Sequence, residues 1–152
     1  MKQLTVIALA TLATCTLATT SALAQKAVPP QGVSPTEITL GSIQDLSGPI
    51  AGFGKQARLG MLLAVDEINA AGGIDGKKIR LITYDDKGEA REAGTAVTRL
   101  TTKDGVVAVL GEVASGLSLA GAPICQEAGI PMVSPSSTNP KVTKIGDMIF
   151  RV

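Results

Sequence analysis

Two hydrophobic patterns alternate along this chain, and their alternation is what most restricts its fold. Short apolar runs bounded by turn residues are typical of strands, and between them lie segments whose apolar residues recur with the period of a helix. We predict strands at residues 38–43, 78–84, 106–110, 131–134 and 148–152, and helices at 55–71, 89–102 and 116–128. A strand, a helix and a strand in succession form a right-handed crossover between parallel strands. The pattern therefore predicts an α/β fold with a doubly wound parallel sheet, covered by helices on both faces.

The predicted helices differ in how clearly the sequence marks their buried faces. The second has an apolar stripe at helical spacing, which consists of Ala93, Ala96, Val97 and Leu100. The apolar face of the first consists of Ala57, Met61, Ala64, Val65 and Ile68. The third contains Pro123, and because proline removes a backbone donor and clashes with the preceding turn, we expect a kink or a restart there.

The N-terminus has the three parts of a secretory signal peptide in the expected order. Lys2 supplies the positive charge, residues 4–17 form an apolar stretch, and Ala22-Leu23-Ala24 forms a small-residue cleavage site. We therefore predict that the protein is exported, that cleavage follows Ala24, and that the mature protein acts outside the cytoplasm.

Two alternatives for this N-terminal segment are weaker. An uncleaved membrane anchor requires a span of about 20 apolar residues, and the many threonines here argue against it. Lipidation at Cys15 would require a lipobox, but Thr14 is an unusual residue in such a motif. Residues 25–35 contain three prolines and are predicted to form a short extended leader before a folded domain that begins at residue 36.

Composition narrows the classes of function. Without Lys2, 13 of the 14 basic residues remain against 13 acidic ones, so the rest of the chain is neutral. There is no tryptophan, there are only one tyrosine and two phenylalanines, and no basic run exists, so we predict no nucleic-acid partner. The chain has no histidine, and Cys125 is the only cysteine beyond the signal segment; we predict no metal or cofactor and a buried, structural Cys125.

Three loops are the places to look for a binding site, because ligands of open parallel sheets bind beyond the carboxyl ends of the strands. These loops are residues 45–54, 111–116 and 134–140, all rich in small or polar residues. Hydroxyl and backbone N–H groups at a helix start can receive a carboxylate or phosphate, which makes Ser115, Ser136 and Thr138 candidates. From composition alone, helix capping and turn closure are the favoured roles for these side chains.

Other motifs in the chain are weaker. Residues 52–57 fit the dinucleotide pattern G-x-G-x-x-A, but they are too far from the preceding predicted strand. Residues 116–120 resemble a nucleophile elbow that has no histidine base, so we predict no enzyme activity and no catalytic residue. Asp85-Asp86 could be a carboxylate pair or metal site, although a solvated turn or helix cap is the favoured interpretation.

A set of motifs, in this order and spacing, resembles the periplasmic leucine/isoleucine/valine-binding proteins of ABC importers. The motifs are Ser47-Gly48-Pro49 followed by Gly54, residues 66–74 (DEINAAGGI), Tyr84-Asp85-Asp86, residues 128–131 (AGIP) and residues 134–140 (SPSSTNP). The resemblance implies a type I periplasmic binding fold, in which two α/β lobes joined by a hinge close on a ligand. Residues 36–152 would then be most of the first lobe. We expect it to be incomplete, with the second lobe absent, because residues 148–152 stop within an apparent strand.

The resemblance also assigns roles to the loops. In that family a serine after the third strand, and a small residue and a threonine after the fourth, hold the α-carboxylate and help to hold the ammonium group of the ligand; by position these are Ser115, Ser136 and Thr138. An aromatic residue of the first loop lines the side-chain pocket, which by position is Phe53. Ala114 stands where some members carry a disulfide cysteine, so that bridge is not expected.

The predicted function is the non-enzymatic solute-binding component of an ABC importer. It would capture a branched-chain amino acid, or a related amide or acid, in the periplasm and present it to a membrane permease. The alternative is the extracellular ligand-sensing domain of a signalling receptor with the same fold, and an enzyme ranks third. Glu112 is expected to face solvent, because a buried charge without a partner would be costly.

Overall fold

The computed structural model describes residues 30–152 and contains five strands, three α-helices and one 3-10 helix within them. In chain order these are β1 (Glu37–Gln44), α1 (Ala51–Ala70), β2 (Lys78–Asp85), α2 (Ala90–Thr102), β3 (Ala108–Leu110), α3 (Ser115–Ala128), β4 (Met132–Ser134), the 3-10 helix η1 (Val142–Lys144) and β5 (Ile149–Arg151). The predicted order of strands and helices is confirmed, with shifts of a few residues at the ends. The predicted signal peptide lies outside the described residues.

The strands form one parallel sheet in the order β2-β1-β3-β4-β5. From β1 the chain crosses to β2 on one side, whereas β3, β4 and β5 follow one another on the other side. The direction of winding therefore reverses between β1 and β3. Because all strands are parallel, the loops after β1, β3 and β4 meet at the same edge of the sheet, beside this switch point.

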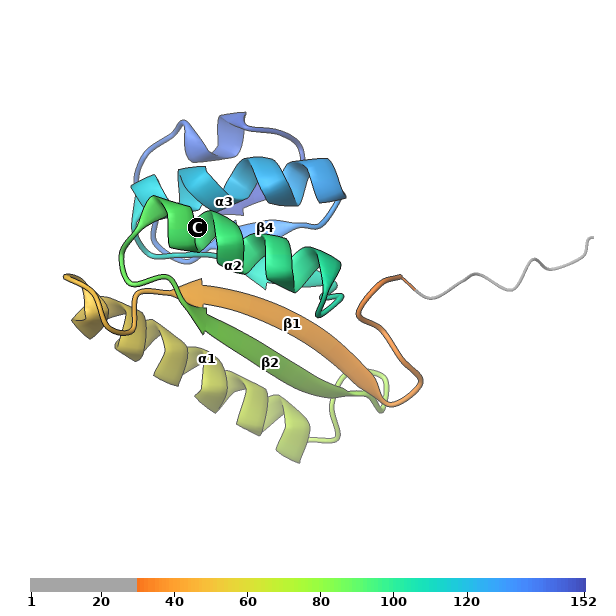
Figure 1. The fold of residues 1–152 in the computed structure, drawn as a ribbon. Coiled ribbons are helices and arrows are strands. Elements are labelled where there is room, and N and C mark those ends of the chain that lie inside the picture. The colour runs from red at the N-terminus through yellow and green to blue at the C-terminus, as the bar shows by residue number, and fades with distance from the viewer. Residues whose placement is uncertain (1–29) are drawn as a thin grey trace, which may run out of the picture.

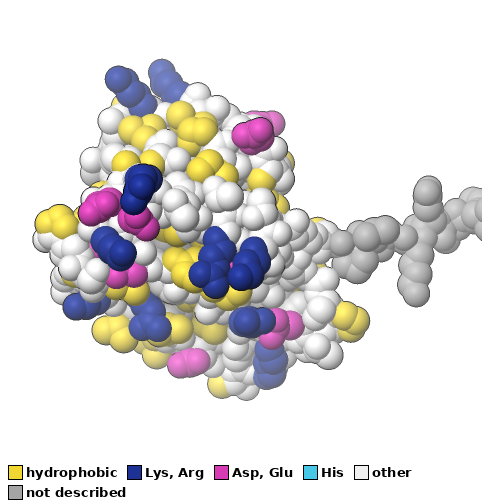
Figure 2. All heavy atoms as spheres, viewed as in Figure 1, with side chains coloured by type: hydrophobic (Ala, Val, Ile, Leu, Met, Phe, Trp, Pro, Cys, Tyr) yellow, Lys and Arg dark blue, Asp and Glu magenta, His cyan; other side chains and the backbone are white. Residues whose placement is uncertain are grey.

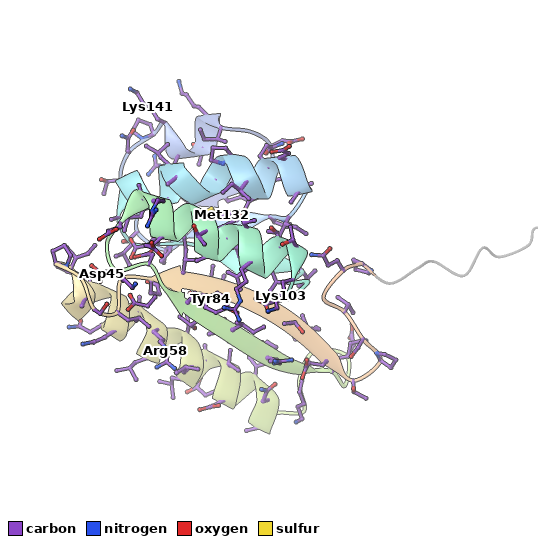
Figure 3. The ribbon with its side chains drawn as sticks, in the orientation of Figure 1. Asp45, Arg58, Tyr84, Lys103, Met132 and Lys141 are labelled. Atoms are coloured by element: carbon purple, nitrogen blue, oxygen red, sulfur yellow. The ribbon has the colours of Figure 1, made fainter. Side chains whose placement is uncertain are left out.

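The two faces of the sheet are covered unequally. Helices α2 and α3 pack together over one face, and α1 covers β1 and β2 on the other (Figure 1). The main core lies under α2 and α3, where the predicted stripe of α2 is buried; other buried side chains come from the strands and include Val109, Met132 and Ile149 (Figure 3). The α/β prediction with helices on both faces is confirmed.

Helix α1 differs from its prediction in both start and burial. It begins at Ala51, four residues before the predicted start, and Gly54 is its only buried residue. Three members of the predicted apolar face are half-buried, whereas Ala64 and Ile68 are exposed. The reason is that α1 packs only against the two strands at one side of the sheet.

The structure adds detail to two further expectations. Helix α3 is assigned as one continuous helix that contains Pro123, so no restart occurs there. Residues 30–35 are not extended: the chain turns at Gly32, Val33 forms a bridge with Ile38, and Gln31 Nε2 donates to the carbonyl oxygen of Thr101 at 2.7 Å. The end of the predicted leader is therefore attached to the domain.

The surface is mixed in charge. Figure 2 shows Lys and Arg side chains interspersed with Asp and Glu over the visible face. Among the helices of residues 30–152, none combines the length and the apolar character that crossing a bilayer requires.

Candidate functional site

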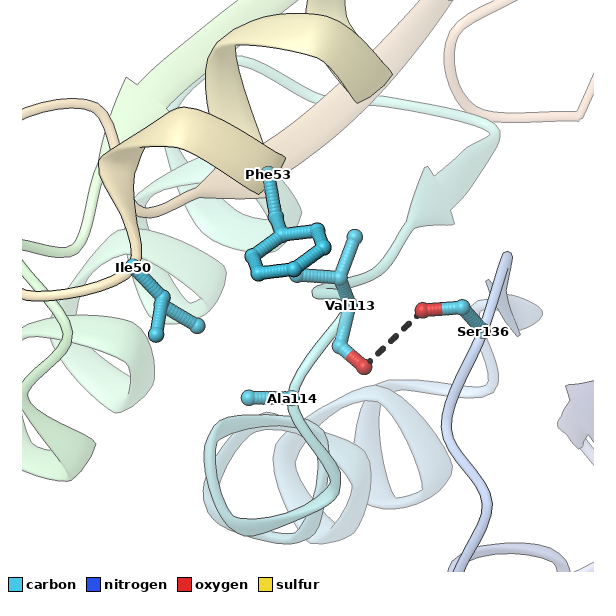
Figure 4. Close-up of a pocket in the computed structure, with 5 residues that line it drawn as sticks. All are labelled: Ile50, Phe53, Val113, Ala114 and Ser136. Atoms are coloured by element: carbon cyan, nitrogen blue, oxygen red, sulfur yellow. Dashed lines mark hydrogen bonds between the residues drawn. The ribbon is translucent and has the colours of Figure 1, made fainter.

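An open pocket of about 270 Å³ lies at the switch point (Figure 4). Ile50 and Phe53 come from the loop after β1 and the first turn of α1, Val113 and Ala114 come from the loop after β3, and Ser136 comes from the loop after β4. The lining is therefore mainly apolar, with one hydroxyl group at its border. The Ser136 hydroxyl donates to the Val113 carbonyl oxygen at 3.1 Å, which ties the second loop to the third.

The structure brings some of the predicted site residues together and leaves others beside the pocket. Phe53, which is 69% exposed, and Ser136 both line it. Ser115 is the first residue of α3, and its Oγ accepts the Asn139 N–H at 3.1 Å. Thr138 is exposed on the loop after β4. Neither Ser115 nor Thr138 lines this pocket, although both belong to loops that do.

Three buried serines, Ser118, Ser134 and Ser137, form a hydroxyl network under the loops after β3 and β4. The Oγ atoms of Ser134 and Ser137 lie 2.7 Å apart, and those of Ser137 and Ser118 lie 2.8 Å apart. Ser118 and Ser134 are also bonded to the Glu112 carbonyl oxygen, at 3.0 and 2.8 Å. Because a hydroxyl both donates and accepts, the three serines and the backbone groups beside them satisfy one another without any charge.

Glu112 is fully buried, so its expected exposure to solvent is wrong. Its Oε1 accepts the Asp45 N–H at 3.0 Å, and its Oε2 accepts the Ala114 N–H in a short hydrogen bond. Backbone donors therefore take the place of the cation that a buried carboxylate would otherwise need. Burial raises the pKa of Glu112; these two hydrogen bonds oppose the rise, and the nearby Asp45 carboxyl adds to it.

Glu112 and three aspartates form a carboxyl cluster under the loops after β1 and β2. Asp45 lies just beyond β1 (Figure 3), and its two oxygens accept the N–H groups of Gly48 and Ile50, the latter at 2.9 Å. Asp85 accepts hydrogen bonds from the backbone of Leu46 and Lys87 and from the Ser47 hydroxyl. Asp86 Oδ1 accepts the Gly88 N–H at 3.0 Å.

Asp86 is the member of the carboxyl cluster whose carboxyl group accepts the fewest hydrogen bonds. It is fully buried, and its Oδ2 has no hydrogen-bond partner within residues 30–152. Burial raises the pKa of Asp86 to about 6, the Gly88 N–H opposes this rise, and the other carboxyl groups of the cluster add to it. The favoured interpretation of Asp85-Asp86 as a solvated turn is therefore wrong for Asp86.

Asp85 behaves differently from its neighbour. Burial acts to raise the pKa of Asp85, but the hydrogen bonds from Ser47, Leu46 and Lys87 together outweigh burial and hold it below its usual value. Asp85 is therefore stabilised as a carboxylate, whereas burial makes Asp86 easier to protonate than an ordinary aspartate. None of the three ion pairs found in the described part of the chain includes a member of the cluster.

The cluster could be considered as a metal site, because Asp45, Asp85 and Asp86 each place one oxygen within 4.8 Å of the others. Asp45 and Asp85, however, already accept backbone N–H groups through their oxygens. The hydrogens of those N–H groups point at the carboxylates and would repel a cation placed there. The arrangement fits the closing of two loops better than the binding of a metal.

The weaker motifs gain no support from their positions. The glycines at 52 and 54 lie in the first turn of α1, where no tight strand-to-helix turn forms. Ser118 of the elbow-like segment is buried in the hydroxyl network, and the sequence has no histidine to activate it. The prediction of a buried Cys125 is confirmed, and burial raises the pKa of its thiol to about 12.

Sequence reasoning missed several residues that shape the site. Ile50 and Val113 line the pocket, yet each is a single apolar residue in a loop without a periodic pattern. The one available signal was their place in the loops that follow predicted strands. The bridging role of Glu112 was also missed, because one of its partners lies 67 residues away in the sequence.

Comparison with known proteins places this architecture in a family. A family model described as "Periplasmic binding protein" matches residues 37–152. The Leu/Ile/Val-binding protein BraC3 of Rhizobium johnstonii is 41% identical over 110 residues, which cover 72% of this chain and 30% of that protein. The Leu/Ile/Val-binding protein homolog 3 of Brucella melitensis is 39% identical over 116 residues, which cover 76% of this chain and 31% of that protein.

Solved structures show the same relationship. The branched-chain amino acid transporter substrate binding protein LivJ from Streptococcus pneumoniae, in complex with isoleucine, matches with a TM-score of 0.74 and 42% identity. The match covers 76% of this chain and 33% of that one. The leucine binding protein LivK from Thermotoga maritima matches with a TM-score of 0.69 and 37% identity, over 75% of this chain and 32% of that one.

The matches cover most of this chain but less than a third of each curated relative. The chain spans about 30% of the length of the curated relatives it matches. The family model, in contrast, covers most of the chain, from the start of β1 to the last residue. By sequence and by fold, this chain belongs to the periplasmic binding protein family that includes the Leu/Ile/Val-binding proteins.

Proposed function

We propose that this chain forms the first lobe of a solute-binding component of an ABC importer, and that it binds a branched-chain amino acid or a similar amino-acid-like molecule. The observation that carries the proposal is the apolar pocket at the switch point, bordered by the Ser136 hydroxyl and by the start of α3. Such a pocket suits a small ligand that has an apolar body and a carboxylate. Relatives of this chain are named as Leu/Ile/Val-binding proteins, and one was solved with isoleucine.

Two hydroxyl groups beside the pocket are free to hold the ligand's charged groups. Ser115 Oγ accepts a backbone N–H, but within the described residues its hydrogen goes to no acceptor. The Thr138 hydroxyl makes no hydrogen bond in the same part of the chain, and its side chain is exposed. The first N–H groups of α3 lack intrahelical acceptors, as at any helix start, and add further donors on the same side.

The rest of the proposal concerns what this lobe works with. Residues 1–24 would direct export and be removed after Ala24, and the lobe would act in the periplasm. A second lobe would close over the pocket, and the closed form would be recognised by a membrane permease. This role requires no catalysis. The signalling-receptor alternative is not favoured, because the relatives that match are named as transport binding proteins.

The test is calorimetric titration of the protein as it is encoded, together with any second lobe, against leucine, isoleucine, valine, amides and aromatic acids. The double variant Ser115→Ala with Thr138→Ala should lose roughly 30-fold or more in affinity, because it removes two charge-assisted hydrogen bonds at about 1–3 kcal/mol each. Thr143→Ala is the matched control. Thr143 lies in η1, and its exposed hydroxyl donates to the Pro140 carbonyl oxygen.

The possible outcomes separate the function from the site. No binding of any compound by the unchanged protein would overturn the proposed function. Binding that the double variant leaves intact would keep the function and refute the assignment of these two hydroxyl groups. The control variant should bind as tightly as the unchanged protein.

A further inference from the structure

Glu112 connects both sides of the pocket although it does not line it. Its Oε1 accepts the N–H of Asp45, which begins the loop that carries Ile50 and Phe53. Its Oε2 accepts the N–H of Ala114, which lines the pocket from the opposite loop. One rigid, planar carboxylate therefore holds the backbones of the two loops at a fixed separation.

The position of Glu112 is itself fixed from below. Its carbonyl oxygen is hydrogen-bonded by the hydroxyl groups of Ser118 and Ser134, so the residue is anchored to α3 and to β4. The side chain is fully buried and has no freedom to adopt another orientation at low cost. A movement of the loop after β1 relative to the loop after β3 must therefore break at least one hydrogen bond to Glu112.

We infer that Glu112 is a positioning residue, which sets the width of the apolar pocket by clasping the loops after β1 and β3. The inference rests on the proposed function in one respect only, namely that this pocket receives the ligand. It assigns to Glu112 no contact with the ligand, since Glu112 is fully buried and does not line the pocket.

The charge of Glu112 gives the clasp a property that a neutral residue would lack. A carboxylate accepts both N–H groups well, whereas a protonated carboxyl keeps one good acceptor. The charged or titratable groups that face Glu112 are the carboxyls of Asp45 and Asp86, and α3 and β4 present only serine hydroxyls. Since burial raises the pKa of Glu112, acidification should loosen the clasp before it protonates ordinary surface glutamates.

The principal test is Glu112→Gln, measured by calorimetric titration of the protein as encoded with its best amino-acid ligand. Glutamine has nearly the same shape but presents an NH₂ group to one of the two backbone N–H donors, so one half of the clasp is lost. We expect the affinity at neutral pH to fall about tenfold. Lowering the pH should weaken ligand binding by the unchanged protein and leave the Gln variant almost unaffected.

Two controls separate positioning from general stability. Val97→Ala removes fully buried methyl groups under α2, away from the pocket, and should lower the melting temperature without changing affinity. Asp86→Asn removes another fully buried carboxyl of the cluster, whose pKa is also raised, and should keep the pH dependence of binding. If Glu112→Gln only lowered the melting temperature, as Val97→Ala does, the inference would be wrong.

A second measurement needs no ligand and therefore does not depend on the proposed function. In the ligand-free protein, Glu112→Gln should increase the hydrogen exchange of the Asp45 or Ala114 amide, resolved by NMR, and leave the Asn139 amide as protected as before. Unchanged exchange at both amides would overturn the clasp whether or not any amino acid binds. If exchange rises but the unchanged protein binds nothing, the clasp stands and the proposed function fails.

Discussion

The floor of the site is built in two different ways. Under the loops after β3 and β4, the hydroxyl groups of Ser118, Ser134 and Ser137 bond to one another and to the Glu112 carbonyl oxygen. Under the loops after β1 and β2, the carboxyl cluster is joined almost entirely to backbone N–H groups. Both regions are buried at the same edge of the sheet, yet only one of them contains charge.

The difference follows from what each group can do in a hydrogen bond. A hydroxyl donates and accepts, so three of them can satisfy one another. A carboxylate only accepts, and without a cation it must take its donors from the backbone. The loops of the carboxyl cluster must therefore fold tightly enough to present N–H groups inward, which makes their backbone less tolerant of added side-chain atoms.

The largest expected effect is on that backbone. Gly54, in the first turn of α1, lies so close to Asp45 that a Cβ atom would come within 2.0 Å of the Asp45 carbonyl oxygen. Gly54→Ala must push α1 away from the loop and should disturb the hydrogen bonds of Asp45. We expect the free energy of unfolding to fall by at least about 3 kcal/mol, measured by urea denaturation.

The hydroxyl side offers a matched control. Gly116 occupies the first turn of α3, and a Cβ atom added there would meet nothing within 4 Å. Gly116→Ala should change stability by less than about 1 kcal/mol, with a gain more natural than a loss, because alanine favours the helix. Equal losses at the two glycines would show that the two regions do not differ in backbone tolerance.

Helix α2 shows where sequence analysis of the fold succeeded, and Gly54 shows where it failed. The stripe of α2 is fully predictable, because its apolar residues repeat with the helical period and all become buried. The start of α1 was placed too late, because glycines at 52 and 54 argue against a helix by propensity. In the structure Gly54 lies in the helix because it has no side chain and so leaves room for the backbone of Asp45. That requirement arises only from the packing of Asp45 against the helix.

The next effect is a loss within the hydroxyl network. Ser134 Oγ accepts the Ser137 N–H at 3.0 Å and lies 2.7 Å from the Ser137 hydroxyl. Ser134→Ala leaves both groups of Ser137 buried with fewer partners, so we expect a loss of about 2 kcal/mol in thermal or urea unfolding. The serine hydroxyls do not titrate, and Ser134 bonds to the backbone carbonyl of Glu112 and not to its carboxyl group, so this loss should be the same at pH 4 and pH 8.

The neighbouring exposed serine calibrates that result. Ser136→Ala removes a hydroxyl whose side chain is exposed, and its effect on stability should stay within about 0.5 kcal/mol. A loss at Ser134→Ala that grew or shrank with pH would mean that the hydroxyl network is coupled to the carboxyl cluster, contrary to the contrast drawn between them.

The site was less predictable than the fold, for a reason that these bonds illustrate. The position of Ser136 beside the pocket could be predicted because its loop follows a predicted strand, and parallel strands bring such loops together. The bonds that position the loops join residues far apart in the chain, such as Glu112 with Asp45, or Ser118 with Ser137. No local pattern reports whether such a glutamate is buried, because its donors are backbone groups that every residue possesses.

The smallest effect expected outside the control variants has the opposite sign and belongs to the carboxyl cluster. The pKa of Asp86 is about 6 in the folded protein and lies near 3.8 in the unfolded chain, so folding favours its protonated form. The stability that this provides is complete below about pH 3.8 and is lost as the pH rises through about 6. The Asp86→Asn variant stays neutral at every pH. Its free energy of unfolding minus that of the unchanged protein should therefore be about 1–2 kcal/mol higher at pH 7.5 than at pH 4.

Asp85 provides the reverse case one residue earlier. The pKa of Asp85 is held below its usual value by hydrogen bonds, so this carboxylate stabilises the fold above its unfolded pKa and loses that effect as the pH falls through its folded pKa. Asp85→Asn should therefore destabilise the protein at pH 7.5 and approach the unchanged protein in strong acid. The measurement is urea unfolding of both variants from pH 3 to pH 8. If hydrogen-bond donors satisfy Asp85 and leave Asp86 unsatisfied, the change in unfolding free energy relative to the unchanged protein should fall with pH for Asp85→Asn and rise with pH for Asp86→Asn. Parallel curves would mean that the cluster titrates as one unit, and the asymmetry between its two adjacent aspartates would then be wrong.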